Sequence, residues 1–305
     1  MSKSNMSKNL ALVSVLLLAL SACATIKKAV HKVGEATGDK DLQKAESKLS
    51  PSQQYYFGRT LAANFFSTSP YVSDKAVSEY VNLVGQYLAH HVDAGKGGAG
   101  PFKGFHFAVI KNPTPMAMSA PGGFVFVSTG MIEQLQSEDQ LAGVLAHEIG
   151  HVMHEHGLDE IENEAIRKGI VKAGAKLAEL AGADDAEDVG KVEAFSKVVD
   201  SGVGLFASQP HSRKHEIASD KFSVRLLARA GYNPAEYAEL MATVTSGGFA
   251  TKHPPGEDRL EAVNQTMVKL KYKDTRAARK TRFAAFKSAV ARVAGTGVRA
   301  PAAAN

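Results

Sequence analysis

A pair of histidines four residues apart constrains this chain more than any other feature. The pentapeptide HEIGH, residues 147–151, lies within the stretch 137–157. On an α-helix, His147 and His151 project from the same face, one turn apart. This is the spacing that two zinc ligands need, and Glu148 beside the first ligand can reach a water held by the metal. The pentapeptide therefore predicts a metal site with Glu148 as its general base.

The surrounding residues predict that the pentapeptide lies on an amphipathic helix. Ser137 can cap the amino end, and Gln140 three residues later completes a capping box. Gly157 is the expected C-terminal stop. Apolar residues recur near helical spacing and predict one buried face: Leu141, Val144, Leu145 and Val152.

Composition narrows the class of protein. The chain has 305 residues, of which 44% are hydrophobic and 22% charged, so an ordinary globular core can form. Its net charge of +5 is a mild basic excess; we expect no nucleic acid as a partner. The single cysteine, Cys23, excludes an internal disulfide.

The amino end has the pattern of a bacterial lipoprotein signal. Basic residues precede the apolar run Leu10–Leu20, which is too short for a membrane-spanning helix of about 20 residues. Leu20-Ser21-Ala22-Cys23 then resembles a lipobox, in which the cysteine becomes the lipidated first residue. We therefore expect residues 1–22 to be a signal peptide and Cys23 to be lipidated. Because Ala24 follows the cysteine, we expect a lipid anchor in the outer membrane, facing the periplasm.

The rest of the chain predicts a mainly helical α+β fold with a small sheet beside the metal helix. Residues 23–50 are polar and lysine-rich, as in a tether. Strands are expected at 105–110 and 124–128, with irregular backbone at 112–121 between them. Helices are expected near 55–66, 74–88, 212–230, 235–244 and 257–271. The segment 159–205 is interpreted as a lid over the cleft or a surface helical hairpin.

Two boundaries follow from this pattern. Residues 51–268 are expected to form the metal-binding domain, and 269–305 a basic amphipathic helix with a disordered tail. Phe283, Phe286, Val290 and Val293 fall on one face of that helix. This face is expected to pack on the domain; the alternative is that the helix lies near anionic headgroups or an acidic partner.

A catalytic zinc usually has three protein ligands and one open position for water. Glu216 and Asp220 lie four residues apart in the run 212–220, so on a helix they share one face. Glu216 can bind zinc while Asp220 accepts the N–H of a ligand histidine. His215, paired with His211 four residues earlier, is the competing ligand. The residues alone leave these alternatives open.

Three motifs, in order along residues 50–265, resemble the zinc peptidases of metallopeptidase family 48, of the HtpX/BepA type. They are Pro121-Gly122-Gly123-Phe124, the pentapeptide at 147–151, and Ser-Arg-x-x-Glu-x-x-Ser-Asp at 212–220. The resemblance implies a zincin-type peptidase fold of the gluzincin group. Since the membrane helices of the HtpX branch are absent from the sequence, it favours the lipid-anchored branch.

The resemblance implies a role for each matching residue. One Zn²⁺ per chain is bound by His147, His151 and Glu216, with Asp220 as the supporting carboxylate. A strand of Gly123, Phe124, Val125, Phe126 and Val127 is an edge that pairs with extended substrate by β-augmentation.

A downstream motif resembles one found in the envelope members of the family. It consists of His253-Pro254 with Arg259 six residues on. The resemblance implies that His253 can approach the zinc from a loop and that Arg259 assists at the transition state. Both residues are therefore candidate catalytic residues.

We expect a zinc-dependent endopeptidase that cleaves misfolded or stalled cell-envelope proteins by attack of a zinc-activated water. Unfolded or misassembled envelope proteins are the expected substrates, and the outer-membrane protein assembly machinery an expected partner. The alternative is a latent or non-proteolytic, chaperone-like assembly factor in which His253 closes the open position on the zinc. A purely structural zinc site would leave Glu148 without a role.

Overall fold

The computed structural model of this chain describes residues 50–92, 100–159, 210–243, 247–273 and 276–295. The expected signal peptide, Cys23, the tether and all but the first residue of the segment 159–205 lie outside this set. Within it, every helix is either too short or too polar to cross a lipid bilayer.

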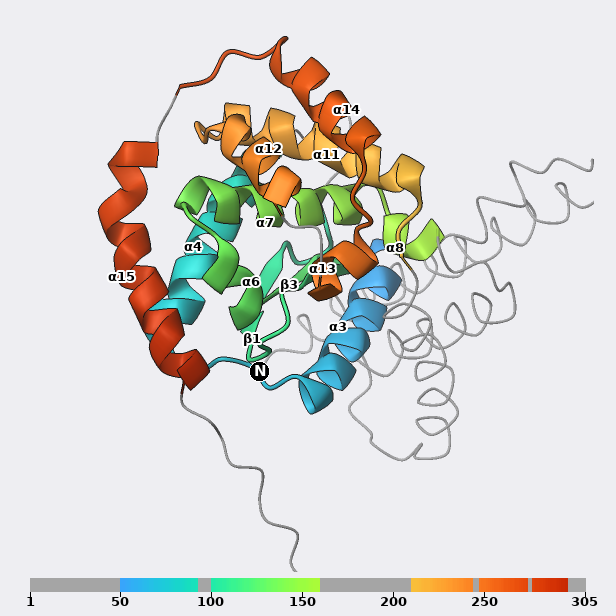
Figure 1. Ribbon diagram of the computed structural model, residues 1–305. Helices are drawn as coiled ribbons and strands as arrows, with labels where there is room; N and C mark the ends of the chain where they lie inside the picture. Colours follow the sequence, from blue (N-terminus) through green and yellow to red (C-terminus); the bar gives the residue numbers. More distant parts are fainter. Residues whose placement is uncertain (1–49, 93–99, 160–209, 244–246, 274–275, 296–305) are drawn as a thin grey trace, which may run out of the picture. The chain divides into compact units, whose positions relative to one another are not determined.

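Helix α7 (Glu138–Met153) carries the pentapeptide and lies at the centre of the fold (Figure 1). Helices α4, α11 and α12 and the sheet all contact it. Ser137 caps its amino end by accepting from Gln140 N at 3.1 Å. The capping box forms with a shift of one residue, because Gln140 Oε1 accepts from Gln136 N rather than from Ser137 N.

Helix α7 ends earlier than the glycine at 157 led us to expect. Met153 is its last residue, and Glu155 adopts a left-handed conformation with φ of 56°. Glu155 N donates to Val152 O at 3.1 Å, and Gln54 Nε2 donates to the Glu155 side chain at 2.8 Å. A non-glycine residue thus makes the turn, and α8 (His156–Asp159) follows directly.

Three strands of the described residues form one sheet in the order β1-β3-β2. Strand β1 (His106–Ile110) pairs in parallel with β3 (Phe124–Ser128), with Phe107 opposite Val125. Strand β2 (Ala117–Ala120) pairs antiparallel with β3 on its other side.

This topology corrects two expectations. The segment 112–121 is not irregular throughout, since it contains β2, and β3 is not an edge strand, since it lies between β1 and β2. Gly123 precedes β3, in the turn after β2. Strand β2 was missed because its sequence, AMSA, lacks β-branched residues and all four residues are buried, so no alternation marks it.

The remaining helices surround this centre. Those expected from the sequence are present with ends shifted by up to a few residues, whereas the short helix at residues 247–252 was not expected. These remaining helices are α3 (Pro51–Thr68), α4 (Lys75–His90), α6 (Thr129–Gln134), α11 (Arg213–Arg229), α12 (Pro234–Thr243), α13 (Gly247–Lys252), α14 (Glu257–Met267) and α15 (Arg276–Gly295). Helix α11 packs across α7, and α14 packs on α11. These contacts bring three segments that are distant in the sequence to one place.

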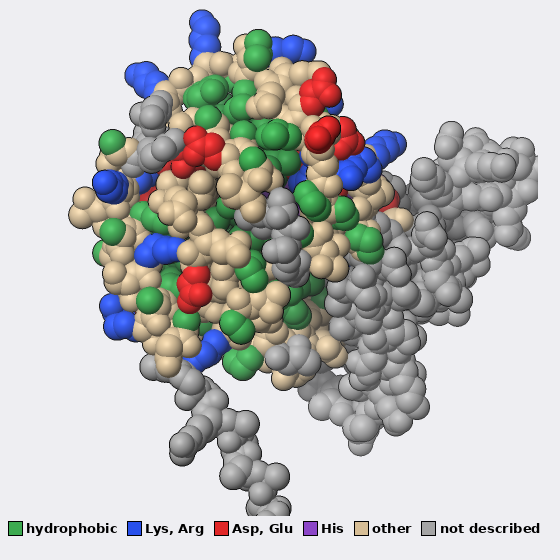
Figure 2. Space-filling view, in the orientation of Figure 1, with side chains coloured by type: hydrophobic (Ala, Val, Ile, Leu, Met, Phe, Trp, Pro, Cys, Tyr) green, Lys and Arg blue, Asp and Glu red, His purple; other side chains and the backbone are tan. Residues whose placement is uncertain are grey.

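Helix α15 packs on the domain through its apolar face, as expected. Phe283, Phe286 and Val290 are buried, and Phe286 stacks on Tyr80 of α4 with ring centroids 4.2 Å apart. Lys287 Nζ donates to carbonyl oxygens at the end of α6, including that of Leu135 at 3.0 Å. Over α15 the basic side chains lie at separate points rather than in one block (Figure 2).

A buried carboxylate joins α15 to the amino end of α7. Glu138 is 1% exposed and accepts from the hydroxyls of Tyr80 and Tyr232 and from the guanidinium of Arg282. Burial alone would raise the pKa of the Glu138 carboxyl, but the hydrogen bonds from Arg282 and Tyr80 outweigh burial and hold it below its usual value. The charge also lies at the positive end of the α7 dipole.

We expect Glu138→Ala to lower the free energy of unfolding by about 2 kcal/mol, because it leaves the buried hydroxyl of Tyr232 and the half-buried hydroxyl of Tyr80 without their acceptor. The control Glu79→Ala removes an exposed glutamate paired with Lys75 and should change it by less than about 0.5 kcal/mol. Urea unfolding monitored by circular dichroism measures both.

The same comparison has a predicted pH dependence. Since the Glu138 pKa is lowered in the fold, its contribution is complete above the ordinary glutamate pKa of about 4.3 and is lost as the pH falls toward the lower folded value. The gap between wild type and Glu138→Ala should therefore narrow in acid. A gap that is constant down to pH 3 would contradict the role given to this carboxylate.

Candidate metal centre

Two helices supply three of the metal-binding candidates. His147 and His151 lie one turn apart on α7, and Glu216 lies in the first turn of α11, which Ser212 caps. All three side chains are at most 2% exposed. Gly150 of α7 permits α11 to pass close to α7, because a Cβ at that position would lie 3.2 Å from Ser219 of α11.

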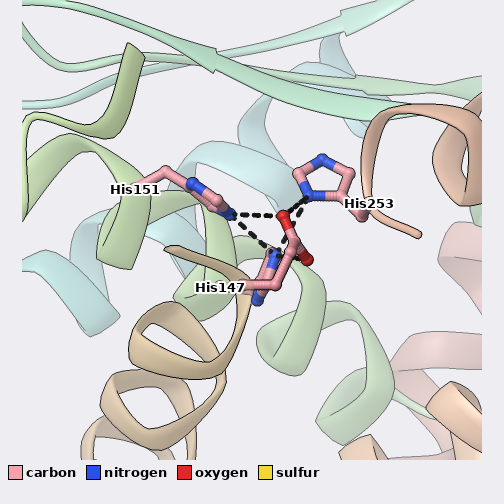
Figure 3. A group of neighbouring side chains, drawn as sticks. His147, His151 and His253 are labelled. Atoms are coloured by element: carbon pink, nitrogen blue, oxygen red, sulfur yellow. Dashed lines mark hydrogen bonds and ion pairs between the residues drawn. The ribbon is translucent and has the colours of Figure 1, made fainter. Parts of the chain in front are cut away.

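The donor atoms of these residues and of His253 face one another within 4.8 Å. Figure 3 shows the three imidazoles pointing toward one another, around a carboxylate that the contacts identify as that of Glu216. Distances between donor atoms are 3.0 Å for His147 Nε2–His151 Nε2, 3.2 Å for His147 Nε2–His253 Nδ1, 3.3 Å for His151 Nε2–Glu216 Oε1, 3.0 Å for His253 Nδ1–Glu216 Oε1 and 3.5 Å for His147 Nε2–Glu216 Oε2.

These distances fit a tetrahedral metal site. Two ligands about 2.1 Å from a tetrahedral zinc are about 3.4 Å apart, and the donor pairs lie between 3.0 and 3.5 Å apart. Imidazole nitrogen and carboxylate oxygen are both zinc ligands. The donor set therefore suits zinc, and His253 Nδ1 is a fourth donor atom beside those of His147, His151 and Glu216.

Glu148 lies on the far side of His253 from Glu216. It is fully buried, and its Oε1 is 3.2 Å from His253 Nε2, in an ion-pair rather than a hydrogen-bond geometry. Burial alone would raise the pKa of the Glu148 carboxyl, but the facing His253 outweighs burial and holds the pKa below its usual value. Glu148 is thus an ionised carboxylate facing the outer nitrogen of His253, and an ionised carboxylate is what a general base requires.

The structure places Asp220 behind His147, as the spacing from Glu216 predicted. Asp220 Oδ1 lies 3.0 Å from His147 Nδ1, the nitrogen that faces away from the donor set. Burial would raise the pKa of the Asp220 carboxyl, but bonds from Arg259 and His147 hold it below its usual value. An ionised carboxylate in this position fixes the histidine tautomer and orients the ring.

Arg259 lies where it can hold the carboxylates rather than a reacting group. Its Nε and Nη2 donate to the two oxygens of Asp220, each at 2.8 Å, and its Nη1 lies 2.7 Å from Glu216 Oε2. Nη1 also donates to the carbonyls of His253 and Pro254. This geometry makes Arg259 a positioning residue; assistance at the transition state stays a prediction.

Tyr237 is a site residue that sequence reasoning missed. Its hydroxyl donates to Asp220 Oδ1 at 2.8 Å and lies 2.9 Å from His147 Nδ1. The ring packs against α7 at Gly143, where a Cβ would lie 2.7 Å from it. Burial and the charge of Asp220 raise the tyrosine pKa well above its usual value, so the phenol keeps its proton. No local pattern signals this contact, which joins residues 90 positions apart.

The competing ligands lie beside the donor set instead of in it. His215 is half-buried and stacks on His156, with ring centroids 4.1 Å apart. His211 stacks on His151, with ring centroids 3.9 Å apart. Of the alternatives that the residues left open, the structure therefore brings Glu216 to the metal-binding position.

A mainly helical domain with a small sheet and a buried His/His/Glu set on a HExxH helix defines a zincin-type metallopeptidase. The model of peptidase family M48 matches residues 79–267, more than half of the chain. The chain belongs to this family.

Curated relatives agree with this assignment. The chain is 24% identical over 211 residues to the beta-barrel assembly-enhancing protease of Escherichia coli K12, covering 69% of this chain and 41% of that protein. It is 26% identical over 213 residues to a putative protein of that name from Vibrio cholerae, with 69% and 42% covered. The chain is also 28% identical over 173 residues to the mitochondrial metalloendopeptidase OMA1 of Schizosaccharomyces pombe, covering 54% of this chain and 47% of that protein. The chain spans less than half the length of each.

We expect Arg259→Lys to weaken zinc binding about ten- to hundredfold, because a lysine cannot make the paired bonds that hold Asp220 and Glu216 in place. Competition with a chromophoric chelator measures the affinity. Arg225→Lys, at an exposed position of α11, is the matched control and should bind zinc as the wild type does. Equal affinity in both variants would refute a positioning role for Arg259.

Proposed function

We propose that this protein is a zinc-dependent metalloendopeptidase. The observation that carries the proposal is the position of Glu148, a fully buried carboxylate 3.2 Å from His253, whose other ring nitrogen faces Glu216 and His147. A structural zinc site has no use for such a group, whereas a hydrolytic site needs a base at this place. Membership of peptidase family M48 supports the same activity.

In this mechanism His147, His151 and Glu216 hold one zinc ion. When bound, zinc supplies Lewis acidity, which lowers the pKa of a water and polarises the scissile carbonyl. Glu148 takes a proton from the attacking water and delivers it to the leaving amine. Asp220, held by Arg259, keeps His147 in the tautomer that leaves Nε2 free for the metal.

We assign the substrate edge to β2 in place of β3. Ser128 N donates to Met116 O at 2.9 Å, which marks a hydrogen-bonded pair in the antiparallel ladder. Because such pairs alternate, Ala117 and Ser119 turn their main-chain N–H and C=O away from β3. Ser119 lines one narrow cavity together with His151. An extended peptide paired with this edge would therefore run past the metal ligands.

A second candidate function rests on His253. Its Nδ1 lies 3.0 Å from Glu216 and 3.2 Å from His147, so it can serve as a fourth ligand. A closed coordination sphere leaves no place for water, which favours a latent enzyme or a chaperone-like binding role. The loop that carries it is held by Arg213, which donates to the carbonyls of Pro254 and Pro255.

We propose misfolded or stalled cell-envelope proteins as substrates, the outer-membrane protein assembly machinery as a partner, and the periplasmic face of the outer membrane as the location. The names of the bacterial relatives, beta-barrel assembly-enhancing proteases, support this setting. The lipobox-like sequence at Cys23 supports a lipid anchor. Incorporation of labelled palmitate into wild type but not into Cys23→Ala tests the anchor.

We expect Glu148→Gln to abolish cleavage of unfolded casein, lowering kcat by at least about 100-fold, because the amide cannot accept the proton of water. Zinc content, measured by atomic absorption, should remain at one ion per chain. Wild type with a chelator should lose activity to the same extent. Normal cleavage by the zinc-loaded variant would refute the mechanism.

His253→Ala separates the two candidate functions. If His253 closes the site of a latent peptidase, its removal should raise the cleavage rate of casein severalfold, since the fourth position becomes available to water. Binding of unfolded protein should be unchanged. Absence of chelator-sensitive cleavage in both wild type and variant would favour the non-proteolytic role.

We expect Ser119→Pro to raise KM about two- to tenfold, because proline lacks the outward-facing N–H that Ser119 offers to a peptide backbone. The β3 ladder should remain intact, since proline is tolerated where the N–H of an edge strand faces outward. Ser119→Ala is the matched control, with the side chain shortened and the N–H kept. Equal KM values in both variants would refute the assignment of β2 as the substrate-binding edge.

A further inference from the structure

We propose that His156 is a positioning residue, which orients the metal ligand His151 by accepting a hydrogen bond from its Nδ1. The inference deepens the proposed function and rests on it, since it assumes that His151 binds a metal through Nε2. In the sequence His156 is one of the histidines that follow His151 near the end of the metal helix.

The two nitrogens of His151 face different surroundings. Nε2 faces the donor set, 3.0 Å from His147 Nε2 and 3.3 Å from Glu216 Oε1. Nδ1 faces away, and lies 3.1 Å from His156 Nδ1. A histidine that binds metal through Nε2 carries its proton on Nδ1, and this proton needs an acceptor. His156 Nδ1 supplies the acceptor and carries its own proton on Nε2.

The chain turns back to bring His156 to this place. On a continued helix, a residue five positions after His151 would project about 140° away from it. The left-handed turn at Glu155 ends α7 first, so His156 begins a new helical turn and its ring lies beneath His151. A buried histidine, 4% exposed, is thus placed by backbone geometry rather than by helical spacing.

Neighbouring groups hold the His156 ring in one orientation. It stacks on the rings of His215 and His154, nearly parallel to both. Its centroid lies 4.1 Å from that of His215 and 5.1 Å from that of His154. The hydroxyl of Ser219 lies 3.2 Å from the same Nδ1. These contacts keep the buried ring with its Nδ1 turned toward His151.

A neutral acceptor has a physical advantage at this position. His147 already rests on the carboxylate of Asp220, and Glu148 and Glu216 add two more buried carboxylates. A further carboxylate behind His151 would add negative charge that needs its own counter-ion. An imidazole orients the ring of His151 without adding charge, so the two ligand histidines are supported in different ways.

Zinc affinity, measured on the full chain by competition with a chromophoric chelator, tests the inference. His156→Phe keeps a planar ring between the stacked histidines but removes the acceptor, and should weaken zinc binding about ten- to hundredfold. His156→Asn places an amide oxygen near the position of Nδ1 and should recover most of the affinity. His90→Leu, at an exposed histidine at the end of α4, should bind zinc within about twofold of wild type.

The outcomes separate this inference from the proposed function. If wild type binds no zinc, the proposed function itself is refuted. If wild type binds zinc and the Phe and Asn variants match it, or lose affinity equally, the role of His156 as acceptor is refuted while the metal site stands. Thermal unfolding of the metal-free proteins identifies a variant that does not fold; His156→Leu then replaces the Phe variant.

Discussion

Glu148, Glu216 and Asp220 bring three carboxylates into an interior from which water is excluded. Leaving one of them unpaired would cost several kcal/mol, so the fold around them depends on the cations that face them. Arg259 is the permanent one, since its guanidinium spans Asp220 and Glu216. The carboxylates of the site therefore depend on the packing of α14, which carries Arg259, against α11.

The other positive group is His253, whose charge depends on its surroundings. Burial disfavours the charged form of His253, but when its imidazole lies between Glu216 and Glu148 they raise its pKa to about 10. A zinc ion placed among the same donors would supply this positive charge instead, and His253 would then act as a neutral ligand or leave. The buried carboxylates can therefore be neutralised in more than one way.

Local spacing made much of this site predictable. The i, i+4 pairs His147/His151 and Glu216/Asp220 are determined by helix geometry, and short capping and apolar patterns mark the helices that carry them. The order of the motifs in a known family then favoured Glu216 over His215. The same logic placed Phe283 and Phe286 of α15 on the core.

What escaped prediction depends on contacts between distant segments. Tyr237 meets Asp220 and His147 only because α12 packs on α7, and no pattern near Tyr237 records that packing. Strand β2 forms because it pairs with β3, although its own residues have a weak preference for strands. The turn at Glu155, which no glycine signals, moved His156 from a helix-end histidine to a contact of a metal ligand.

Helix α15 lies beyond residue 267, where the match to the family model ends, yet it completes the interior. It covers Tyr80 of α4, supplies the guanidinium that neutralises Glu138, and caps the carbonyls at the end of α6. The recognisable peptidase sequence is therefore shorter than the folding unit. A chain cut after α14 would keep every metal ligand and still lose the support at the start of the helix that carries two of them.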